Sequence, residues 1–363
     1  MNKKIIVRAG VPQPSGTLVT SASIARLPVL FSANAFALTK NREFLGFNTR
    51  AAANLPEGLD AALDSAGFVA AVVYGDYRWS PEQYYDLVAA RKWAWHAAMD
   101  FCCEPPVAGA LVIRKLRLEA TASGYWSCVA EAKRRDLDLP LCVLQGWYPE
   151  DYVRCVDMLA IQDWPDMVGV GSVCRRNVGG PDGIEKIVDA LDRVLPKHVK
   201  FHFFGVKGGA VKQLGGHHRF ASLDSMAYDY VLRTKQRTGR TQLMRVEAMI
   251  DWQTGQAAVE PMDWQLRVAS QSLLGRDDCT VAPQRSTSQR VADVIHTALS
   301  DWYGGNLLVG HGYRSTNGMA VEQATFLCLV YQTSGLDGLL DWLAESSDSA
   351  DQAVLEALDE CRD

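Results

Sequence analysis

The chain has 363 residues, of which 48% are hydrophobic and 22% charged, a composition that excludes a mainly disordered or fibrous protein. Its 37 Lys and Arg residues against 42 Asp and Glu give a formal net charge of −5, which excludes a protein that binds polyanions through its overall charge. Any contact with nucleic acid therefore has to use a local basic patch.

The cysteines and the N-terminus indicate a cellular location. The nine cysteines are an odd number and several lie within apolar runs, which is typical of reduced, packed thiols. Lys3 and Lys4 are followed by an apolar stretch too short for a signal peptide, and no run of about 18 apolar residues occurs. We expect a soluble, cytoplasmic protein with no membrane contact.

Short apolar segments alternate with longer amphipathic ones over the first two thirds of the chain. We predict strands at residues 27–31, 59–64, 94–101, 139–145, 167–173, 198–206 and 220–224. We predict helices between them at residues 81–93, 124–135, 149–161 and 181–195. This order favours a parallel sheet. Glycines follow many strands rather than one early Gly-rich turn, so we predict an α/β fold of the TIM-type (β/α)8 barrel.

The pattern changes after about residue 245. Apparently helical segments follow at residues 264–274, 288–302, 321–332 and 335–343. We therefore predict a barrel domain over residues 1–245 and a mainly helical C-terminal region over residues 246–363. The last stretch, residues 345–363, is strongly acidic, which favours a solvated helix face that would repel a phosphate backbone.

Two aspartates each close an apolar segment. Asp64 stands in Leu-Asp-Ser-Ala-Gly-Phe and Asp224 in Leu-Asp-Ser-Met-Ala-Tyr. If both segments are barrel strands, the two carboxylates share one rim, where a pair suits glycosidic-bond chemistry as nucleophile and proton carrier. The alternative is that each aspartate caps the helix that follows it, and spacing alone does not decide between them.

Further polar residues and glycines close the strands between these two. Asp100, Gln145 with Gly146, and Gly171 with Ser172 could form a hydrogen-bonding slot for a planar, purine-like base. Ordinary loop chemistry is the alternative for each of them. No Cys and His spacing matches a compact zinc site, and no phosphate-loop motif occurs, so we predict neither a metal nor a cofactor.

Basic residues gather in two places near the same rim. Arg175 and Arg176 follow the Gly171 turn, and a second cluster follows Asp224. The second cluster consists of Arg233, Lys235, Arg237, Arg240 and Arg245. Both could contact a nucleic-acid backbone, although an exposed helix face also explains each cluster.

With these residues assembled, the chain resembles the tRNA-guanine transglycosylase superfamily, and most of all its DNA-modifying branch, the deazapurine-in-DNA transglycosylases (DpdA). The resemblance covers roughly residues 25 to 235. Five short motifs match those of the family in order: residues 63–68, 99–102, 143–146, 170–173, and 203–206 followed by 223–228. Each motif alone is weak evidence for the family, but the ordered set is fairly specific.

The resemblance implies a glycosyltransferase of the pentosyltransferase type on a TIM barrel. Such an enzyme exchanges guanine in a polynucleotide for a 7-deazaguanine base such as 7-cyano-7-deazaguanine (preQ0). The resemblance assigns Asp224 as the nucleophile and Asp64 as the general acid and base. Its base-binding positions match Ser65, Asp100, Cys102, Gln145, Gly146, Gly171 and Ser172.

The chain departs from the tRNA-modifying queuine-type enzymes in lacking their CxCxxC-plus-His zinc motif. This absence, and the lack of a recognisable RNA-binding domain after residue 245, favours DNA over tRNA as the partner. Three alternatives stay open: a zinc-less tRNA enzyme, a non-catalytic base-binding partner subunit, and a carbohydrate-directed glycosidase. An accessory protein and a homodimer also stay open, as does the identity of the deazaguanine.

Four aromatic residues are candidates for stacking on the target base, with core packing as their alternative: Tyr74, Tyr77, Trp79 and Trp147.

Overall fold

The structure is a computed structural model, and the chain divides into two compact units. Unit 1 comprises Met1–Gly67, Arg78–Phe101 and Leu118–Asp277, and unit 2 comprises Phe68–Tyr77, Cys102–Arg117 and Asp278–Asp363. The residues that the structure describes are 5–40, 43–174, 176–180, 183–206, 209–229, 232, 241–262, 264, 291, 294–295, 298–299, 327–328, 330–331, 336–344, 346 and 349–360.

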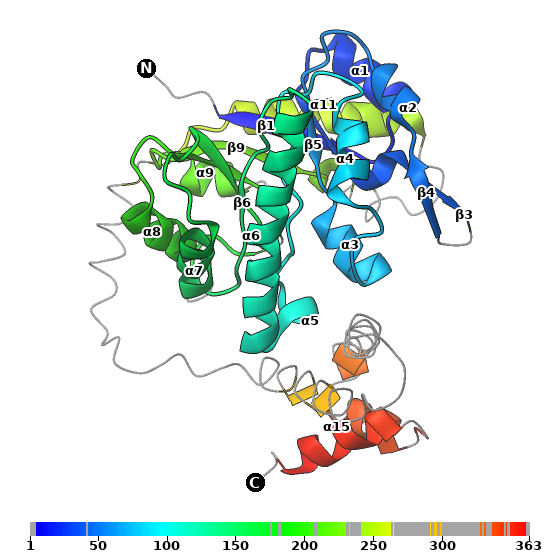
Figure 1. Cartoon of the computed structure of the whole chain (residues 1–363), viewed down its shortest axis with the longest axis vertical. Coiled ribbons are helices and arrows are strands. Elements are labelled where there is room, and N and C mark those ends of the chain that lie inside the picture. The colour runs from blue at the N-terminus through cyan, green and yellow to red at the C-terminus, as the bar shows by residue number, and fades with distance from the viewer. Residues whose placement is uncertain are drawn as a thin grey trace. The chain divides into compact units, whose positions relative to one another are not determined.

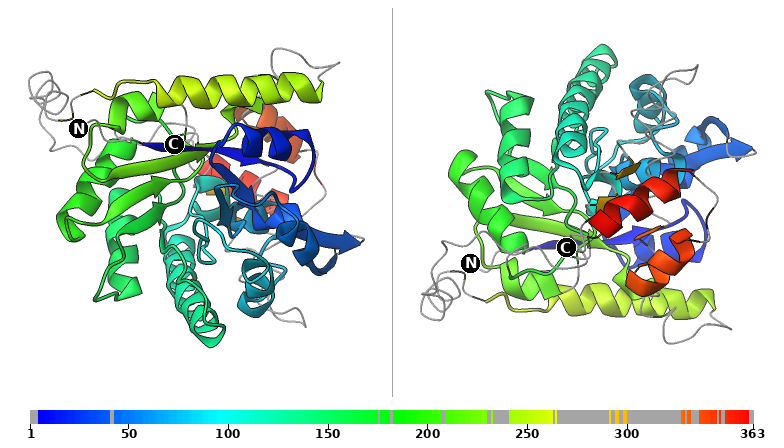
Figure 2. Two further views of the ribbon diagram at one scale, coloured as in Figure 1. Left: turned by 90° about the horizontal axis from the view of Figure 1, so that it is seen from above. Right: turned by 90° about the horizontal axis from the view of Figure 1, so that it is seen from below.

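A curled, seven-stranded parallel sheet forms the centre of unit 1 (Figures 1 and 2). Its order is β5-β2-β1-β9-β8-β7-β6. The strands are β1 (Ile6–Val11), β2 (Val29–Ser32), β5 (Ala61–Asp64), β6 (Val143–Leu144), β7 (Met167–Val170), β8 (Lys200–Phe203) and β9 (Phe220–Ser225). Buried apolar side chains such as Phe31, Phe201 and Leu223 fill its strands. The parallel α/β architecture predicted from the sequence is confirmed.

The predicted strand at residues 94–101 forms two isolated parallel bridges rather than a regular strand. Leu63 of β5 bridges to His96, and Ala97 bridges to Leu141 just before β6. The backbone N–H of Ala97 donates to Leu63 O at 2.8 Å, and that of Leu141 donates to His96 O at 2.7 Å. This segment therefore links the two edge strands of the sheet by backbone hydrogen bonds.

Helices of unit 1 lie outside the sheet (Figure 2). They are α1 (Thr17–Ile24), α2 (Thr49–Ala53), α4 (Pro81–Val88), α7 (Pro149–Leu159), α8 (Ile184–Val194), α9 (Gly209–Leu214) and α11 (Gln242–Ala257). The long helix α6 (Leu111–Arg134) runs from unit 2 into unit 1. A short 3-10 helix (Ala33–Phe36) and a hairpin of β3 (Ala37–Lys40) and β4 (Glu43–Phe47) follow β2.

One predicted helix start is confirmed and another is wrong. Helix α4 starts as predicted at Pro81, where Ser80 and Gln83 form a capping box. Helix α6 starts at Leu111 rather than at the predicted residue 124. Gly124 lies inside this helix. A Cβ at this position would lie 2.4 Å from Met99 O, so the glycine permits the helix to pack closely against Met99.

Strand β1 was not predicted, because Arg8 interrupts its apolar pattern. Arg8 is 3% exposed and lies on the strand between β2 and β9. Its guanidinium donates a 2.7 Å hydrogen bond to Asp60 Oδ1, and it lies 5.6 Å from the centre of the Trp95 ring. A buried cation with an acidic partner is thus tolerated inside a strand.

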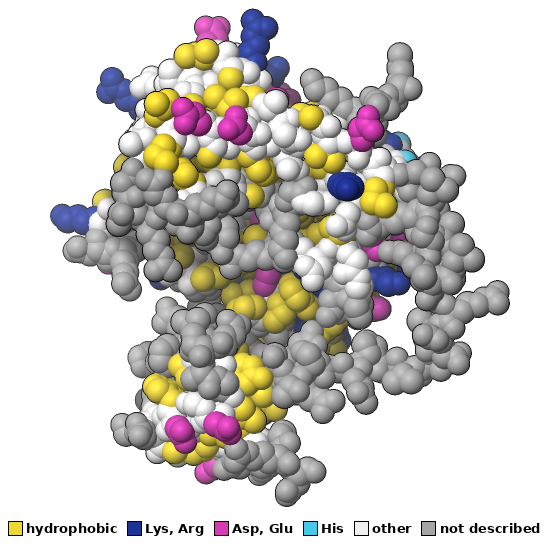
Figure 3. Space-filling model, turned by 180° about the vertical axis from the view of Figure 1, so that it is seen from behind, with side chains coloured by type: hydrophobic (Ala, Val, Ile, Leu, Met, Phe, Trp, Pro, Cys, Tyr) yellow, Lys and Arg dark blue, Asp and Glu magenta, His cyan; other side chains and the backbone are white. Residues whose placement is uncertain are grey.

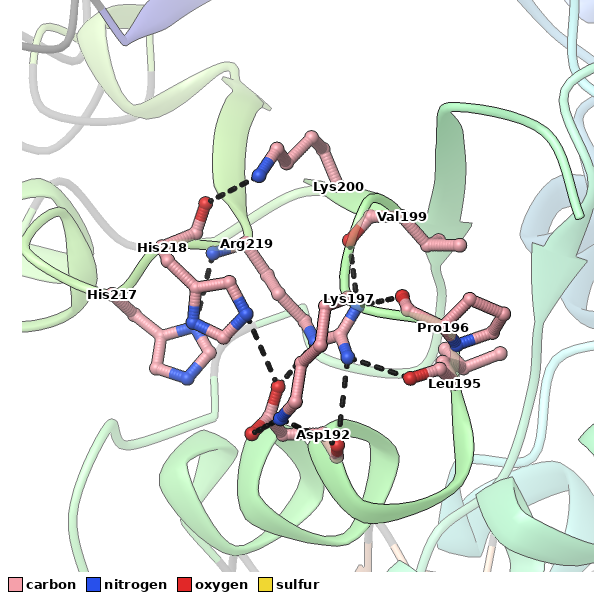
Figure 4. Close-up of polar contacts among 9 residues, drawn as sticks. All are labelled: Asp192, Leu195, Pro196, Lys197, Val199, Lys200, His217, His218 and Arg219. Atoms are coloured by element: carbon pink, nitrogen blue, oxygen red, sulfur yellow. Dashed lines mark hydrogen bonds and ion pairs between the residues drawn. The ribbon is translucent and has the colours of Figure 1, made fainter.

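A fully buried arginine, Arg219, lies at the end of the sheet where β9 (Phe220–Ser225) begins, and it bonds several neighbouring segments (Figure 4). Arg219 donates to the carboxylate of Asp192 and to the carbonyl oxygens of Leu195, Pro196 and Val199. Leu195 is the C-cap of α8, and Pro196 and Val199 lie in the turn before β8, so one guanidinium bonds carbonyl groups at the helix end and in the turn. Arg219 therefore ties α8 to β9.

Helix α11 crosses residue 245, the predicted domain boundary. Its Gln253 side chain donates to Val7 O of β1 at 2.6 Å and to Pro28 O at 2.7 Å. This part of the predicted C-terminal region therefore packs within unit 1. The boundary itself stays a prediction.

Unit 2 contains α3 (Gly67–Tyr74) apart from its first residue, α5 (Pro105–Ala108), the start of α6 and the described C-terminal helices. Its buried cluster includes two residues of α15 (Ser349–Glu360), Val354 and Leu358. The other members are Val291, Ile295, Leu299, Leu327, Leu339, Leu340 and Leu343. All described residues of the predicted segments 288–302, 321–332 and 335–343 are helical. The predicted segment 264–274 lies outside the described residues apart from Trp264.

Candidate active site

The predicted site residues of unit 1 follow the carboxyl ends of its strands. Asp64 is the last residue of β5, and Asp224 is the last but one of β9. Gln145 comes directly after β6, and Gly171 comes directly after β7. Because the strands are parallel, these ends share one edge of the sheet, which is where α/β proteins place their chemistry.

Four of the predicted base-binding residues form one buried hydrogen-bonded group. Ser65 Oγ donates to Asp100 Oδ1 at 2.8 Å, and Gln145 Nε2 donates to Asp100 Oδ2. Ser172 Oγ donates to Gln145 Oε1 at 2.6 Å. Each of these four side chains is at most 6% exposed. The structure thus brings together residues that are up to 107 positions apart (172 − 65).

Two glycines make room for this group. A Cβ at Gly171 would lie 2.2 Å from Gln145 Nε2, and one at Gly146 would lie 2.8 Å from the Tyr152 ring. Tyr152 in turn donates its hydroxyl to Gly171 O at 2.7 Å. Both positions therefore need glycine for close packing around Gln145.

Two other residues at this edge have left-handed backbones although they carry side chains. Ala66 has φ 71° and Ser172 has φ 51°. Such conformations are strained for L-residues and are concentrated at functional sites. They occur directly after Ser65 and directly after Gly171, where they orient members of the hydrogen-bonded group.

Asp64 has an unusual proton affinity. Burial, the charge of Asp100 and the charge of Asp224, in that order, raise the pKa of Asp64 to about 8. In a flat sheet, β5 and β9 would be about 14 Å apart across three strand spacings, so this coupling depends on the curl of the sheet. Asp64 therefore carries a proton at neutral pH.

Asp224 is 8% exposed and its Oδ1 atom is held from two sides. The backbone N–H of Gly205 donates to it at 3.0 Å, and Nε2 of His202 lies 3.3 Å from it. Gly205 has φ 65°, a left-handed turn after β8 that glycine adopts without strain. Sequence reasoning missed His202 because it lies between Phe201 and Phe203 inside β8, and its polarity there was the available signal.

The other predicted residues are less closely tied to this group. Cys102 is buried in unit 2, where the Arg117 guanidinium donates to its carbonyl oxygen and lies 3.5 Å from its Sγ atom. Arg176 lies with its guanidinium 3.9 Å from the centre of the Trp147 ring and donates to Trp147 O at 2.6 Å. The predicted backbone-contact residues Arg175, Arg233, Lys235 and Arg237 lie outside the described residues, as does Arg240.

Two further candidates from the sequence, Trp79 and Arg245, make contacts within the fold. Trp79 is 4% exposed and its ring lies 5.2 Å from that of Phe47, which agrees with the core-packing alternative. Arg245 pairs with Asp229 at 2.8 Å. On the face shown in Figure 3, the described Lys and Arg side chains are scattered rather than gathered in one patch.

Within the described part of the chain, Asp192, His217 and His218 have ligand atoms close enough to hold a metal ion. The Asp192 carboxylate already pairs with Lys197 and Arg219 (Figure 4). Burial alone would raise the pKa of Asp192, but hydrogen bonds from Lys197 and Arg219 outweigh it and lower the pKa to about 2. Two cations at the carboxylate oppose a third, so this group fits an ion-pair network better than a metal site.

Comparison with known proteins identifies one family. The model of DpdA, described as DeoxyPurine in DNA protein A, matches residues 44–271. This range includes both aspartates and the whole hydrogen-bonded group. No curated protein matches the chain. No helix among the described residues is long and apolar enough to cross a membrane.

Proposed function

The chain belongs to the DpdA family, deoxypurine in DNA protein A, and we propose that it is a DNA guanine transglycosylase. In this proposal it replaces guanine in DNA by a 7-deazaguanine base such as 7-cyano-7-deazaguanine. The reaction proceeds through a covalent glycosyl-enzyme on Asp224. It is a pentosyl transfer, because the deoxyribose moves from one base to the enzyme and then to another.

The observation that carries this proposal is the different state of the two aspartates at one sheet edge. Asp64, with its pKa raised to about 8, holds a proton that a leaving base needs. Oδ1 of Asp224 accepts from Gly205 N–H and lies 3.3 Å from His202 Nε2, while Oδ2 accepts no hydrogen bond from a described residue and is the oxygen we assign to the attack. Paired carboxyl groups with separate roles are the requirement of a retaining glycosyl transfer.

The reaction then runs in two balanced halves. Asp224 attacks C1′ of the target nucleotide, the C1′–N9 bond breaks, and the electron pair leaves with guanine as Asp64 donates its proton. Asp64, now ionised, accepts the N9 proton of the incoming 7-deazaguanine. That nitrogen attacks C1′ and releases the Asp224 carboxylate. Two inversions retain the β configuration.

We assign the hydrogen-bonded group to binding of the heterocycle. The Asp100 carboxylate can accept two N–H bonds from a guanine-like edge, and the Gln145 amide can both donate and accept. Binding a base requires exchange of the internal bonds from Ser65 and Gln145 for bonds to the ligand. Gly171 and Ser172 contribute backbone contacts in this assignment, and Gly146 and Cys102 stay assigned as in the family pattern.

Arg176 supports a role in DNA binding. It is 7% exposed, and its Nε and Nη1 atoms, like Trp147 Nε1, have no hydrogen-bond partner in the described part of the chain. A buried guanidinium with free donors favours an anionic ligand, and a DNA phosphate is one. We propose Arg176, with Arg175, Arg233, Lys235 and Arg237, as the backbone contacts. The target nucleotide has to leave the base stack to reach Asp224.

We also propose that the sheet is part of a (β/α)8 barrel. The supporting observation is that residues 94–98 bond to β5 on one side and to residue 141 on the other. They would then occupy the eighth strand position. Amide hydrogen exchange tests this: the N–H groups of Ala97 and Leu141 should be as protected as those of β8, and rapid exchange would contradict closure.

The proposed function is tested by base exchange. The protein is incubated with labelled guanine and DNA in one reaction, and with labelled guanine and tRNA in another. The label retained in each polymer and the covalent adduct are measured. We expect label in DNA, and loss of both signals in Asp224→Ala by roughly 10,000-fold or more. Asp229→Asn is a matched control, since Asp229 is a buried aspartate that pairs with Arg245.

Other outcomes identify the alternatives. Label in tRNA alone would favour a zinc-less tRNA enzyme, and an adduct with a saccharide alone would favour a glycosidase. Base binding without label in either polymer, in the presence of cell extract, would favour a non-catalytic partner subunit. A persistent adduct in Asp224→Ala would remove Asp224 as the nucleophile. The accessory protein, the homodimer and the cytoplasmic location stay predictions.

A further inference from the structure

His202 lies beneath Asp224 in the interior of unit 1. It is the third residue of β8, stands in register with Ser222 of β9, and is fully buried. Its Nδ1 atom lies 2.8 Å from Ser222 Oγ, and its Nε2 atom lies 3.3 Å from Asp224 Oδ1. Ser222 and Asp224 are two residues apart on one strand, so their side chains share one face and the imidazole reaches both.

The two oxygens of Asp224 have different surroundings. Oδ1 accepts from Gly205 N–H at 3.0 Å and faces His202 Nε2. Oδ2 accepts no hydrogen bond from any described residue. A carboxylate with one oxygen fixed and the other unbonded presents a single atom for attack.

The surroundings of His202 restrict it to this contact. Aromatic rings of Trp95 and Phe204 each lie 4.7 Å from the imidazole centre and keep it in place. Burial lowers the pKa of His202 despite the opposing effect of Asp224, and Arg8 lowers it further, so the ring is neutral at pH 7. The buried Nε2 atom of His202 makes no hydrogen bond to a described residue in this structure, and Asp224 Oδ1 lies 3.3 Å from it.

We propose that His202 is a positioning residue for the nucleophile. In this proposal its neutral ring carries the proton on Nε2 and directs it to Asp224 Oδ1, while Nδ1 accepts from the Ser222 hydroxyl, which turns to it from Met167 Sδ at 3.8 Å. Oδ2 is therefore the atom that attacks C1′. This inference rests on the proposed function, which makes Asp224 the nucleophile.

The same contact affects the second half of the reaction more than the first. In the glycosyl-enzyme, Oδ1 is an ester carbonyl oxygen and accepts a weaker hydrogen bond than a carboxylate does. When the incoming base attacks, negative charge returns to Asp224, and the Nε2–H and Gly205 N–H groups stabilise it. Loss of the histidine donor should therefore slow release of the covalent intermediate.

The kinetic experiment compares His202→Phe with His202→Gln in base exchange on DNA. Phe fills the space between Trp95 and Phe204 without a donor, whereas Gln retains an N–H of similar reach. We expect His202→Phe to exchange base about 10- to 100-fold more slowly and to accumulate the DNA adduct, and His202→Gln to recover part of the rate. His96→Phe is the control, since His96 is also buried and neutral but contacts the Tyr85 hydroxyl.

A merely structural role predicts a different result. It would lower the exchange rate of His202→Phe in proportion to the folded fraction, with no change in the share of folded enzyme held as adduct. That result, or a Gln variant no faster than the Phe variant, would overturn the proposal.

A second measurement does not depend on activity. Nitrogen NMR of histidine-labelled protein should show His202 protonated on Nε2 alone at pH 7, with its signal shifted in Asp224→Ala. Protonation on Nδ1 instead would overturn the positioning role whatever the enzyme does. The expected tautomer in a wild-type protein that forms no adduct with any polymer would instead contradict the proposed function, while the contact between His202 and Asp224 stands.

Discussion

The two ends of the sheet in unit 1 each carry an aspartate, yet the two carboxyl groups differ widely in proton affinity. At the end that precedes β9, Asp192 has two cationic partners and a pKa lowered to about 2. At the end that follows β5, Asp64 has two acidic neighbours, Asp100 and Asp224, and a pKa raised to about 8. Burial raises the pKa at both positions, so the charge of the neighbours decides the outcome. One end is built to hold α8 and β9 together, and the other keeps a proton.

The largest loss of stability is expected at the structural end. Arg219→Met removes the guanidinium but keeps much of its apolar volume, so it leaves the Asp192 carboxylate and three backbone carbonyls without their shared donor. We expect a loss of about 3–5 kcal/mol in the free energy of unfolding. Urea denaturation measures it, and a loss below about 1 kcal/mol would show that Arg219 does not hold this end together.

The opposite sign is expected for Asp64. The folded chain keeps the Asp64 proton that the unfolded chain releases above about pH 4, so wild-type stability falls by up to about 1.4 kcal/mol per pH unit until about pH 8. Asp64→Asn removes this dependence, so the stability of the variant relative to that of the wild type should rise as pH increases from 4 to 8. Denaturation at several pH values tests it. Parallel curves for the two proteins would contradict a raised pKa.

Asp100 affects both the pKa of Asp64 and the proposed binding of the heterocycle. Asp100→Asn removes a negative charge that raises the pKa of Asp64 and a carboxylate that we assign to the heterocycle. Affinity for free 7-deazaguanine should fall by about 1–3 kcal/mol, as for an unsatisfied buried partner. Calorimetry of base binding measures the change. An unchanged affinity would remove Asp100 from the base pocket.

The smallest effect is expected for Lys197. Its ammonium pairs with Asp192 at 2.7 Å, but its side chain is 72% exposed. Solvent screening limits such pairs, so Lys197→Met should cost at most about 1 kcal/mol. Urea denaturation of this variant beside Arg219→Met separates the two cations. Equal losses would show that burial of Arg219 does not distinguish it from Lys197.

Six of the seven strands of the parallel sheet, all but β1, were predicted together with the residues that end them, because apolar runs closed by a polar residue are visible in the sequence. The hydrogen-bonded group of Ser65, Asp100, Gln145 and Ser172 matches residues chosen from the sequence, although their mutual bonds were not predictable. Those bonds depend on the curl of the sheet and on the space left by Gly171, which are properties of the assembled strands.

The missed features share one cause. Strand β1 contains Arg8, and β8 contains His202, so each places a polar side chain within a buried strand. A pattern search treats such a residue as an interruption or ignores it. Its partner, Asp60 for the first and Asp224 for the second, is distant in sequence and became evident only in the structure. Polar residues inside apolar strands therefore mark where a sequence analysis should look for a remote partner.

The division of the chain into two units also constrains the order of folding. Unit 2 is assembled from separate segments that leave unit 1 after β5, after residue 101 and after residue 277. The second and third of these segments are separated along the chain by β6 to β9, so closing the intervening loop costs entropy before they can meet. Unit 1 contains the strand pairings that shorten that loop. A synthesis that stops before β9 should therefore leave both units incomplete, and the unit boundaries offer no single cut that would release unit 2 intact.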